Sequence, residues 1–214
     1  MSLPDLLLIG TGGHSHACID AIEQQGRYRL IGLVGVDGEA AATHLGYPVI
    51  GTDADLPRLA RQCSLALIGV GHIQSAAPRQ RLYQQLLALG FDLPAVVSAS
   101  AYVSRHARIG AGTLVLHGAI INAGAQVGVN CIINSRALVE HDARVGDHCH
   151  IATGAILNGD ASVGAGSFLG SGCSVKQGVH IGQGCTVGMG LALRHPVPDN
   201  TRFVGGQPGP RPTP

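Results

Sequence analysis

The sequence is poor in charge, in aromatic rings and in long apolar segments, and each shortage excludes a class of protein. Charged residues make up 13% of the 214 residues, and 14 Lys and Arg nearly balance 13 Asp and Glu. A sequence-independent nucleic-acid binder needs an excess of cations to neutralise phosphates, so this function is excluded. Aromatic residues reach only 3%, Trp is absent and Gly occurs 32 times. This composition is typical of a tightly wound, repetitive backbone.

Signals for membranes and for cysteine chemistry are also missing. No apolar run approaches the roughly 18 residues of a membrane span, and the N-terminus MSLPDLLLIGTGG has an acid where a signal peptide carries Lys or Arg. We therefore expect a soluble, cytoplasmic protein with no membrane partner. No C-x-x-C pair occurs, which argues against a zinc ribbon or a thioredoxin-type site. Four of the six cysteines occupy one phase of the repeat described next and are interpreted as buried thiols: Cys131, Cys149, Cys173 and Cys185.

A six-residue repeat dominates the second half of the chain. An aliphatic residue occurs at every sixth position from Val97 to Leu193, over seventeen consecutive positions, and a mostly small residue follows each one four positions later. This period is typical of a parallel β-helix, in which each hexapeptide forms one flat face with its corner and three hexapeptides form a coil. We expect the aliphatic residues to fill the interior and the frequent glycines to permit the turns at the corners.

The first 95 residues follow a different pattern, in which apolar strands alternate with helical segments. We expect strands over residues 6–9, 28–36 and 65–70, and helices over 16–25, 56–62 and 78–89. This alternation predicts a small Rossmann-like α/β domain over residues 1–95, followed by a β-helix domain with a C-terminal tail over residues 96–214. In α/β domains, ligands bind outside the carboxyl ends of the strands.

A glycine-rich loop, GTGGHS at residues 10–15, follows the first strand and opens a helix. Its backbone N–H groups and the positive end of the helix suit a phosphate or pyrophosphate. The dinucleotide fingerprint requires a glycine where Ser15 stands, and the acid expected about 20 residues further on is Asp37, slightly late. We therefore favour a mononucleotide or nucleotide-sugar site over NAD, with a glycine turn that binds nothing as the plain alternative.

Three histidines lie close together in VEHDARVGDHCHIATGA, namely His141, His148 and His150. His141 is flanked by Glu140 and Asp142. An imidazole can take a proton from an attacking amine or hydroxyl, and a carboxylate on its other nitrogen fixes the tautomer and raises its basicity. We therefore interpret His141 as a functional residue, whereas a lone histidine elsewhere on a β-helix surface is more simply a solvated polar residue.

These segments together resemble one family. GTGGHSHACIDAI near the start, VEHDARVGDHCHIATGA in the repeat and FVGGQPGPRP at the end look like the PglD/NeuD type of sugar acyltransferase, a branch of the hexapeptide-repeat acyltransferases. The resemblance implies an N-terminal nucleotide-binding α/β domain joined to a C-terminal left-handed parallel β-helix. It also implies acetyl-CoA as co-substrate, no bound cofactor or metal, and a homotrimer.

The resemblance also assigns roles to residues. His141 would be the general base, with Asp142 its favoured partner and Glu140 the alternative. His150 would contact the thioester end of acetyl-CoA, and Ser171 and Met189 would line the pantetheine groove. The nucleotide part of the acceptor would be held by Gly12, Gly13, His14 and Asp37, with Gly71 and His72 nearby. Candidates for the CoA phosphate are Arg194, Arg202 and Arg211.

The implied activity is direct transfer of acetyl from acetyl-CoA to a nucleotide-linked amino sugar, expected to be a UDP-4-amino sugar, in bacterial glycan biosynthesis. Three alternatives stay open. In the first, the acceptor is a hydroxyl of a sialic-type sugar, since the same base serves an amine and a hydroxyl. In the second, the protein is a zinc-dependent hydratase of the carbonic-anhydrase kind, with ligands drawn from His117, His141, His148 and His150. In the third, the repeat is a scaffold without catalysis.

Overall fold

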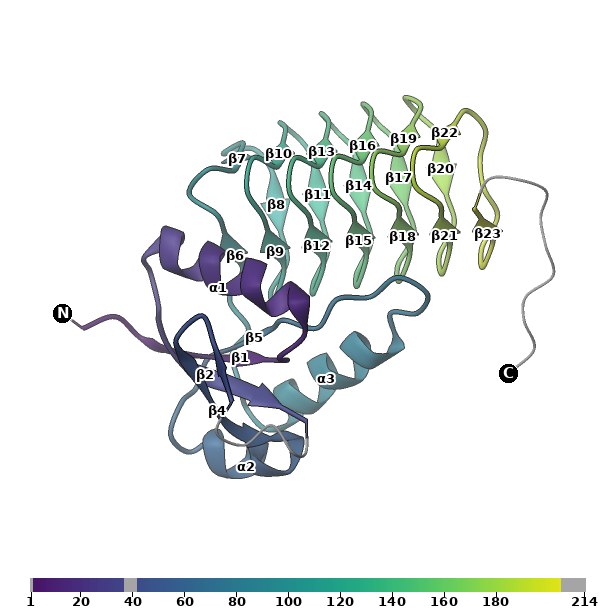
Figure 1. The fold of residues 1–214 in the computed structure, drawn as a ribbon. Helices are drawn as coiled ribbons and strands as arrows, with labels where there is room; N and C mark the ends of the chain where they lie inside the picture. Colours follow the sequence, from purple (N-terminus) through teal and green to yellow (C-terminus); the bar gives the residue numbers. More distant parts are fainter. Residues whose placement is uncertain (1, 37–41, 205–214) are drawn as a thin grey trace.

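The computed structural model describes residues 2–36 and 42–204 and shows two parts, an α/β part that ends before β6 at Val96 and a long β-helix formed by the rest (Figure 1). The α/β part has a five-stranded sheet with the order β3-β4-β2-β1-β5, in which only β3 and β4 pair antiparallel. Its strands are β1 (Asp5–Ile9), β2 (Arg29–Gly35), β3 (Thr43–His44), β4 (Tyr47–Thr52) and β5 (Ala66–Ile68).

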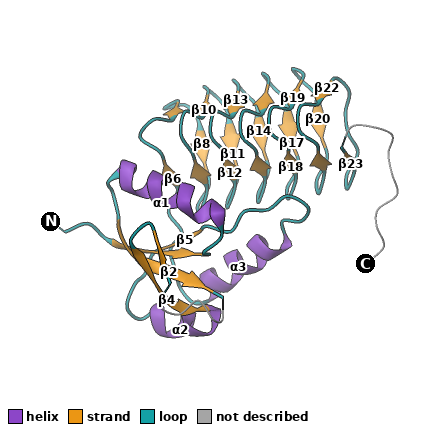
Figure 2. Cartoon of the chain, viewed as in Figure 1, coloured by secondary structure: helices purple, strands orange, loops and turns teal. Residues whose placement is uncertain are grey.

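Helices cover both faces of this sheet (Figure 2). Helix α1 (Gly13–Gln25) packs with Leu6 and Leu8 of β1, while α2 (Leu56–Leu59) and α3 (Ala77–Ala88) pack with Leu7 and Ile9, so alternate residues of one strand enter two cores. A short 3-10 turn, η1 (Asp53–Asp55), precedes α2. None of the described helices is long and apolar enough to span a bilayer.

Several local expectations differ from the structure. Helix α2 ends at Leu59 and not at residue 62, β5 spans only Ala66–Ile68, and β3 was not predicted. Helix α1 begins at Gly13, three residues earlier than predicted, because Gly12 in extended conformation serves as its N-cap. Strand β4 was not predicted, since Pro48 breaks its pattern. Pro48 lies before Val49, the first residue of β4 that pairs with β2, so its missing N–H costs no hydrogen bond to that neighbour.

The second part is the left-handed parallel β-helix that the resemblance implies. Its strands have two residues each, and each pairs with the strand 18 residues further on, as Ile120 pairs with Leu138, except that β21 and the last strand β23 lie 16 residues apart. Three sheets form the three faces of the prism. The first sheet consists of β7 (Tyr102–Val103), β10 (Ile120–Ile121), β13 (Leu138–Val139), β16 (Ile156–Leu157), β19 (Ser174–Val175) and β22 (Ala192–Leu193).

The second sheet consists of β8 (Arg108–Ile109), β11 (Gln126–Val127), β14 (Arg144–Val145), β17 (Ser162–Val163) and β20 (His180–Ile181). The third consists of β6 (Val96–Val97), β9 (Leu114–Val115), β12 (Ile132–Ile133), β15 (His150–Ile151), β18 (Phe168–Leu169), β21 (Thr186–Val187) and β23 (Arg202–Phe203).

The interior of the prism follows the predicted repeat. The aliphatic residue is the second residue of each strand, and from Val115 to Leu193 it is buried inside, together with the small residues and four cysteines. Successive coils lie so close that a Cβ at Gly146 would be 2.7 Å from the backbone nitrogen of Ala165. Glycine is required there because the approaching atom belongs to the backbone.

The α/β part packs on the third sheet of the prism. Val96, Leu114 and Leu116 point out of the β-helix into the core that holds α1, Leu6 and Leu8. Leu114 and Ile132 are therefore buried although they lie on the outside of the prism. This packing sets the carboxyl ends of β1 and β5 beside β15 and β18, where His14 and His72 approach His150 and Phe168.

Candidate active site

His141 occupies the corner that links β13 to β14, with 56% of its side chain exposed. Its ring nitrogen Nδ1 lies 3.0 Å from Asp142 Oδ2, whereas Glu140 Oε2 accepts a hydrogen bond of 3.0 Å from the backbone N–H of His141. Asp142 has φ of +62°, a turn conformation that Asp tolerates better than most residues. Asp142 is therefore the hydrogen-bond partner of the His141 ring, and Glu140 is the partner of the His141 backbone N–H.

This arrangement prepares His141 to accept a proton. When Nδ1–H donates to Asp142, the lone pair remains on Nε2. The hydrogen bond that His141 donates to Asp142 raises the pKa of His141, and the negative charges of Asp142, Glu140 and Asp160 add to that increase. The corner therefore presents a basic imidazole nitrogen at the surface, which is suited to proton abstraction from an attacking group.

A second cluster lies where the α/β part meets the β-helix. The ring centroids of His14 and His72 lie 6.2 Å and 5.5 Å from that of His150, and Phe168 packs edge-on at 5.2 Å. His150 is 8% exposed, and both of its ring nitrogens are engaged. Nδ1–H donates to the carbonyl of His72 at 2.7 Å, and Nε2 accepts from the amide of Asn134 at 3.1 Å.

Burial keeps these three imidazoles neutral. It lowers the pKa of His14 and of His150 to about 4 and that of His72 to about 3. The charge of Arg79 adds to the effect at all three, and His150 adds to it at His14 and His72. Nε2 of His14 and both ring nitrogens of His72 are buried without a hydrogen bond of good geometry to the residues that the structure describes. Buried polar atoms of this kind are usually paired.

The glycine loop lies next to this cluster. Gly12 and Gly13 are exposed, a Cβ on either would meet no atom within 4 Å, and no side chain caps α1. A Cβ on Gly71 would lie 3.7 Å from the ring of His14. The structure therefore brings five of the predicted acceptor residues together at the carboxyl ends of β1 and β5: Gly12, Gly13, His14, Gly71 and His72. Asp37 lies outside the described residues.

His141 belongs to a different side of the prism. It follows β13 of the first sheet, whereas His150 lies in β15 of the third sheet, nine residues or half a coil further on. Ser171 and Met189 lie at the corners that follow β18 and β21, both exposed, with Met189 at 77%. One chain thus places His141 and the predicted acceptor residues of the glycine loop on separate sides.

The four histidines considered for zinc do not converge. His117 Nε2 lies 2.9 Å from Asp20 of α1, His148 contacts Asn130 at 2.9 Å, and the other two make the contacts given above. Within residues 2–36 and 42–204, no three His, Cys, Asp or Glu side chains are placed to hold a metal ion. The structure therefore offers no support for the hydratase alternative.

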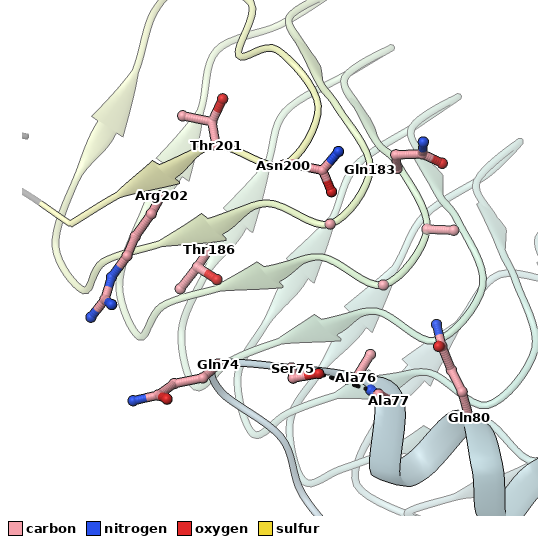
Figure 3. Close-up of a pocket in the computed structure, with 13 residues that line it drawn as sticks. Gln74, Ser75, Ala76, Ala77, Gln80, Gln183, Thr186, Asn200, Thr201 and Arg202 are labelled. Carbon is pink, nitrogen blue, oxygen red and sulfur yellow. Dashed lines mark hydrogen bonds between the residues drawn. The ribbon is translucent and has the colours of Figure 1, made fainter. Parts of the chain in front are cut away.

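An open cleft of about 640 Å³ lies between the loop before α3 and the last coils of the β-helix (Figure 3). Its lining residues are mainly amides, hydroxyls and small side chains, with one cation and no acid: Gln74, Ser75, Ala76, Ala77, Gln80, Ala165, Gly166, Gln183, Gly184, Thr186, Asn200, Thr201 and Arg202. Of the candidates for the CoA phosphate, Arg202 lines this cleft, Arg194 is exposed elsewhere and Arg211 lies outside the described residues.

Cys149 lies between two of the histidines in sequence, yet its side chain points into the prism. It is fully buried, and its Sγ donates to the carbonyl of Gly164 at 3.1 Å. Burial raises its pKa far above the ordinary value, and that of Cys131 to about 12. A thiol of this kind cannot serve as a nucleophile at neutral pH.

Sequence reasoning missed two residues of this region. Gly159 lies one coil beyond His141 and packs against its ring, a relationship that the 18-residue coil length by itself predicts. Arg79 is fully buried at the junction. Its position in an ordinary polar helix pattern gave no signal of that burial.

Two family models match the chain. The PglD N-terminal domain matches residues 5–86, and the hexapeptide repeat of succinyl-transferase matches residues 161–194. Among curated proteins, no sequence matches significantly.

Solved structures resemble nearly the whole chain. PerB from Caulobacter crescentus, in complex with CoA and GDP-perosamine, is 35% identical, with a TM-score of 0.88 and coverage of 95% of each chain. A mutant of the Caulobacter perosamine N-acetyltransferase in which a histidine is replaced by asparagine gives 34% identity, a TM-score of 0.89 and the same coverage. The acetyltransferase domain of PglB from Neisseria gonorrhoeae, in complex with acetyl coenzyme A, is 30% identical, with a TM-score of 0.87 and coverage of 95% of this chain and 97% of that one.

Proposed function

Because the chain belongs to the PglD/NeuD-like family and is an acetyltransferase of that family, we propose that it transfers acetyl from acetyl-CoA to the amine of a nucleotide-linked amino sugar, with His141 as general base. The observation that carries the proposal is the pair formed by His141 and Asp142, which leaves a basic Nε2 at the surface. Bacterial glycan biosynthesis is the setting that such an acceptor implies.

The pair supports a direct transfer. The neutral amine of the acceptor attacks the thioester carbonyl, and a C–N bond forms while the carbonyl π electrons move to oxygen. Nε2 of His141 takes the proton that the amine loses, and collapse of the tetrahedral intermediate expels CoA as a thiolate that recovers a proton. The Asp142 carboxylate stabilises the imidazolium in between. The buried, inert cysteines leave no thiol for an acyl-enzyme.

The acceptor side is proposed at the glycine loop. The N–H groups of the exposed residues Gly12 and Gly13 at the start of α1 suit a diphosphate, and the buried Nε2 of His14 and ring of His72 suit polar groups of the ligand. The nucleotide was expected to be UDP. Since the Caulobacter relative is named as a complex with GDP-perosamine, the acceptor proposed here is a nucleotide amino sugar that carries either uracil or guanine.

The co-substrate is proposed to run along the last coils. Ser171 and Met189 offer an exposed edge for pantetheine, and the cleft with Arg202 and no lining acid suits the phosphates. For His150 to contact the thioester, its Nε2 would exchange the amide of Asn134 for the ligand.

A homotrimer is proposed to complete the site. The first sheet exposes an apolar column, with Tyr102 at 58% and Ile120 at 39% exposure and with Leu138 and Ile156 continuing it. A second copy that covers this column would also bring His141 of one chain near the glycine loop of another. Within a single chain, His141 and the glycine loop lie on separate sides of the prism.

The test is a thiol-release assay with acetyl-CoA and a panel of UDP- and GDP-linked amino sugars, GDP-perosamine among them, and free sialic acids. We expect CoA release with an amino sugar and a loss of about 10² to 10⁴-fold in kcat for His141→Ala. His106→Ala, which changes an exposed histidine between β7 and β8, two coils before Asp142, should leave kcat unchanged. Release only with hydroxyl acceptors would instead support the O-acetyltransferase. Activity retained in His141→Ala would overturn the role of the base.

A further inference from the structure

Arg79 is a fully buried arginine at the junction between the two parts of the chain. It is the third residue of α3 and uses both terminal nitrogens of its guanidinium. Nη1 donates to the carbonyls of Ile68 at 2.8 Å and Val70 at 2.6 Å, at the end of β5. Nη2 donates to Asn130 in the β-helix, to Oδ1 at 2.6 Å and to the carbonyl at 3.3 Å.

This position is electrostatically unfavourable for a cation. Among the described residues, no carboxylate forms an ion pair with Arg79, and its Nε is buried without a partner. The first turn of α3 carries the positive end of the helix dipole, which repels a cation. Burial also lowers the pKa of Arg79 to about 10, because removal from water disfavours the charged form of the guanidinium. A residue kept in such a place is expected to serve more than packing.

The bonds of Arg79 hold one short segment. In the stretch from Ile68 to His72, alternate carbonyls all accept hydrogen bonds from outside the sheet. Arg79 holds those of Ile68 and Val70, and Nδ1–H of His150 holds that of His72. Between them, the amide of Gly69 donates to Ile9 of β1 at 2.8 Å. The segment that carries Gly71 and His72 is therefore fixed from both sides.

The other end of the link lies inside the β-helix. Asn130 is fully buried at the corner between β11 and β12, with φ of +52°. Its amide nitrogen lies 3.3 Å from the carbonyl of Arg79 and 2.9 Å from Nδ1 of His148, one coil further on. Arg79 and Asn130 thus exchange hydrogen bonds in both directions, and the coil next to them leads directly to His150.

We propose that Arg79 is a positioning residue. Through Asn130, it holds residues 68–72, which lie beside the glycine loop, in one position against the β-helix. The guanidinium is required for this role because its two terminal nitrogens reach the β5 carbonyls and Asn130 at the same time, which one ammonium nitrogen cannot do. The predicted effect on catalysis rests on the proposed function, whereas the effect on the segment itself does not.

The first arm of the test measures hydrogen exchange, which needs no substrate. Arg79→Lys keeps the charge and removes the bridge, and Asn130→Gly keeps the positive φ and removes the side-chain link, so it serves if the lysine variant does not fold. We expect exchange over residues 66–72 to become at least about tenfold faster in either variant, while strands β9 to β12 stay protected. Arg81→Lys, on the exposed side of α3, is the matched control and should change nothing.

The second arm measures steady-state kinetics well below the melting temperature of each variant. We expect the KM for the amino sugar to rise or kcat to fall by about tenfold or more, with an unchanged KM for acetyl-CoA. Exchange that stays at the native rate over residues 66–72, exchange that accelerates evenly through both parts of the chain, or wild-type kinetics in Arg79→Lys would overturn the proposal. A wild-type protein that acetylates no acceptor would contradict the proposed function alone, and the exchange arm would still decide on Arg79.

Discussion

The imidazole of His141 packs against Gly159, the residue one coil further along the chain. A Cβ added to Gly159 would lie 2.5 Å from Nε2 and 2.6 Å from Cε1 of His141. Because Nε2 is the nitrogen that Asp142 leaves free, the absence of a side chain at position 159 is what makes room for the proposed base.

Replacement of this glycine tests that relationship. Gly159→Ala should push the imidazole off its position and lower kcat by about tenfold or more, while the melting temperature changes little because residue 159 does not need a positive φ. Gly178→Asn, at an exposed turn in the next coil where a Cβ meets nothing, is the control. An alanine variant with full activity would show that the ring position is not critical.

The pH dependence of catalysis should report the pair of His141 and Asp142. The base must be unprotonated, so activity is lost as the pH falls through the pKa of His141, which Asp142 holds above its ordinary value of 6.5. Asp142→Asn should move this acidic limb of the kcat profile to lower pH and lower its plateau by on the order of 100-fold. Asp160→Asn, at the same corner one coil on, should shift the limb less. A limb that stays in place in Asp142→Asn would contradict the pairing.

The buried histidines should make the junction sensitive to acid. In the folded protein His150 has a pKa of about 4, against 6.5 in an unfolded chain, so between these values only the unfolded state takes up the proton. The free energy of unfolding should therefore fall as the pH drops from about 6.5 to about 4, by about 3 kcal/mol for His150 alone. Urea unfolding at several pH values measures this.

A variant identifies the source of that loss. His150→Gln should flatten the dependence on pH, and His106→Gln, which changes an exposed histidine, should leave it as steep as in the parent. Equal slopes in the parent and in His150→Gln would assign the acid sensitivity to other groups.

Cys149 should be dispensable for catalysis. Cys149→Ala should keep kcat within about twofold and lower the free energy of unfolding by about 1 kcal/mol, because it removes a buried sulfur atom from the prism. Native protein should also react slowly with an aromatic disulfide reagent, since all six cysteines are buried. Loss of activity in a folded alanine variant would reopen the thiol nucleophile.

The apolar column on the first sheet should control assembly. Ile120→Glu should yield a folded chain of lower mass in sedimentation and with little activity, because a charge replaces the side chain at the proposed contact between copies. Arg108→Glu, on the second sheet, controls for the charge itself. An Ile120→Glu variant that keeps the mass and activity of the parent would place the contact elsewhere.

The sequence by itself determined most of the β-helix. The six-residue period gives the number of faces, the coil length and the identity of the inward residues, because each hexapeptide repeats one local geometry and its contacts are made with identical units. The alternation of strands and helices likewise predicts the α/β part. The acids beside His141 lead to the prediction that it is a general base, since its partner is the next residue. Strand β4 was not predicted, because Pro48 interrupts the local pattern of apolar residues from which a strand is inferred.

Only the tertiary structure decided how the two parts meet. Nothing in the local pattern shows that the third sheet is the covered one, that His150 gives both ring nitrogens to His72 and Asn134, or that Arg79 reaches across to Asn130. The choice of Asp142 over Glu140 for the ring also depended on the turn at φ of +62°. The contacts of His150 and Arg79 join residues that are far apart in the chain, and the contact of His141 depends on one dihedral angle. The sequence period encodes neither.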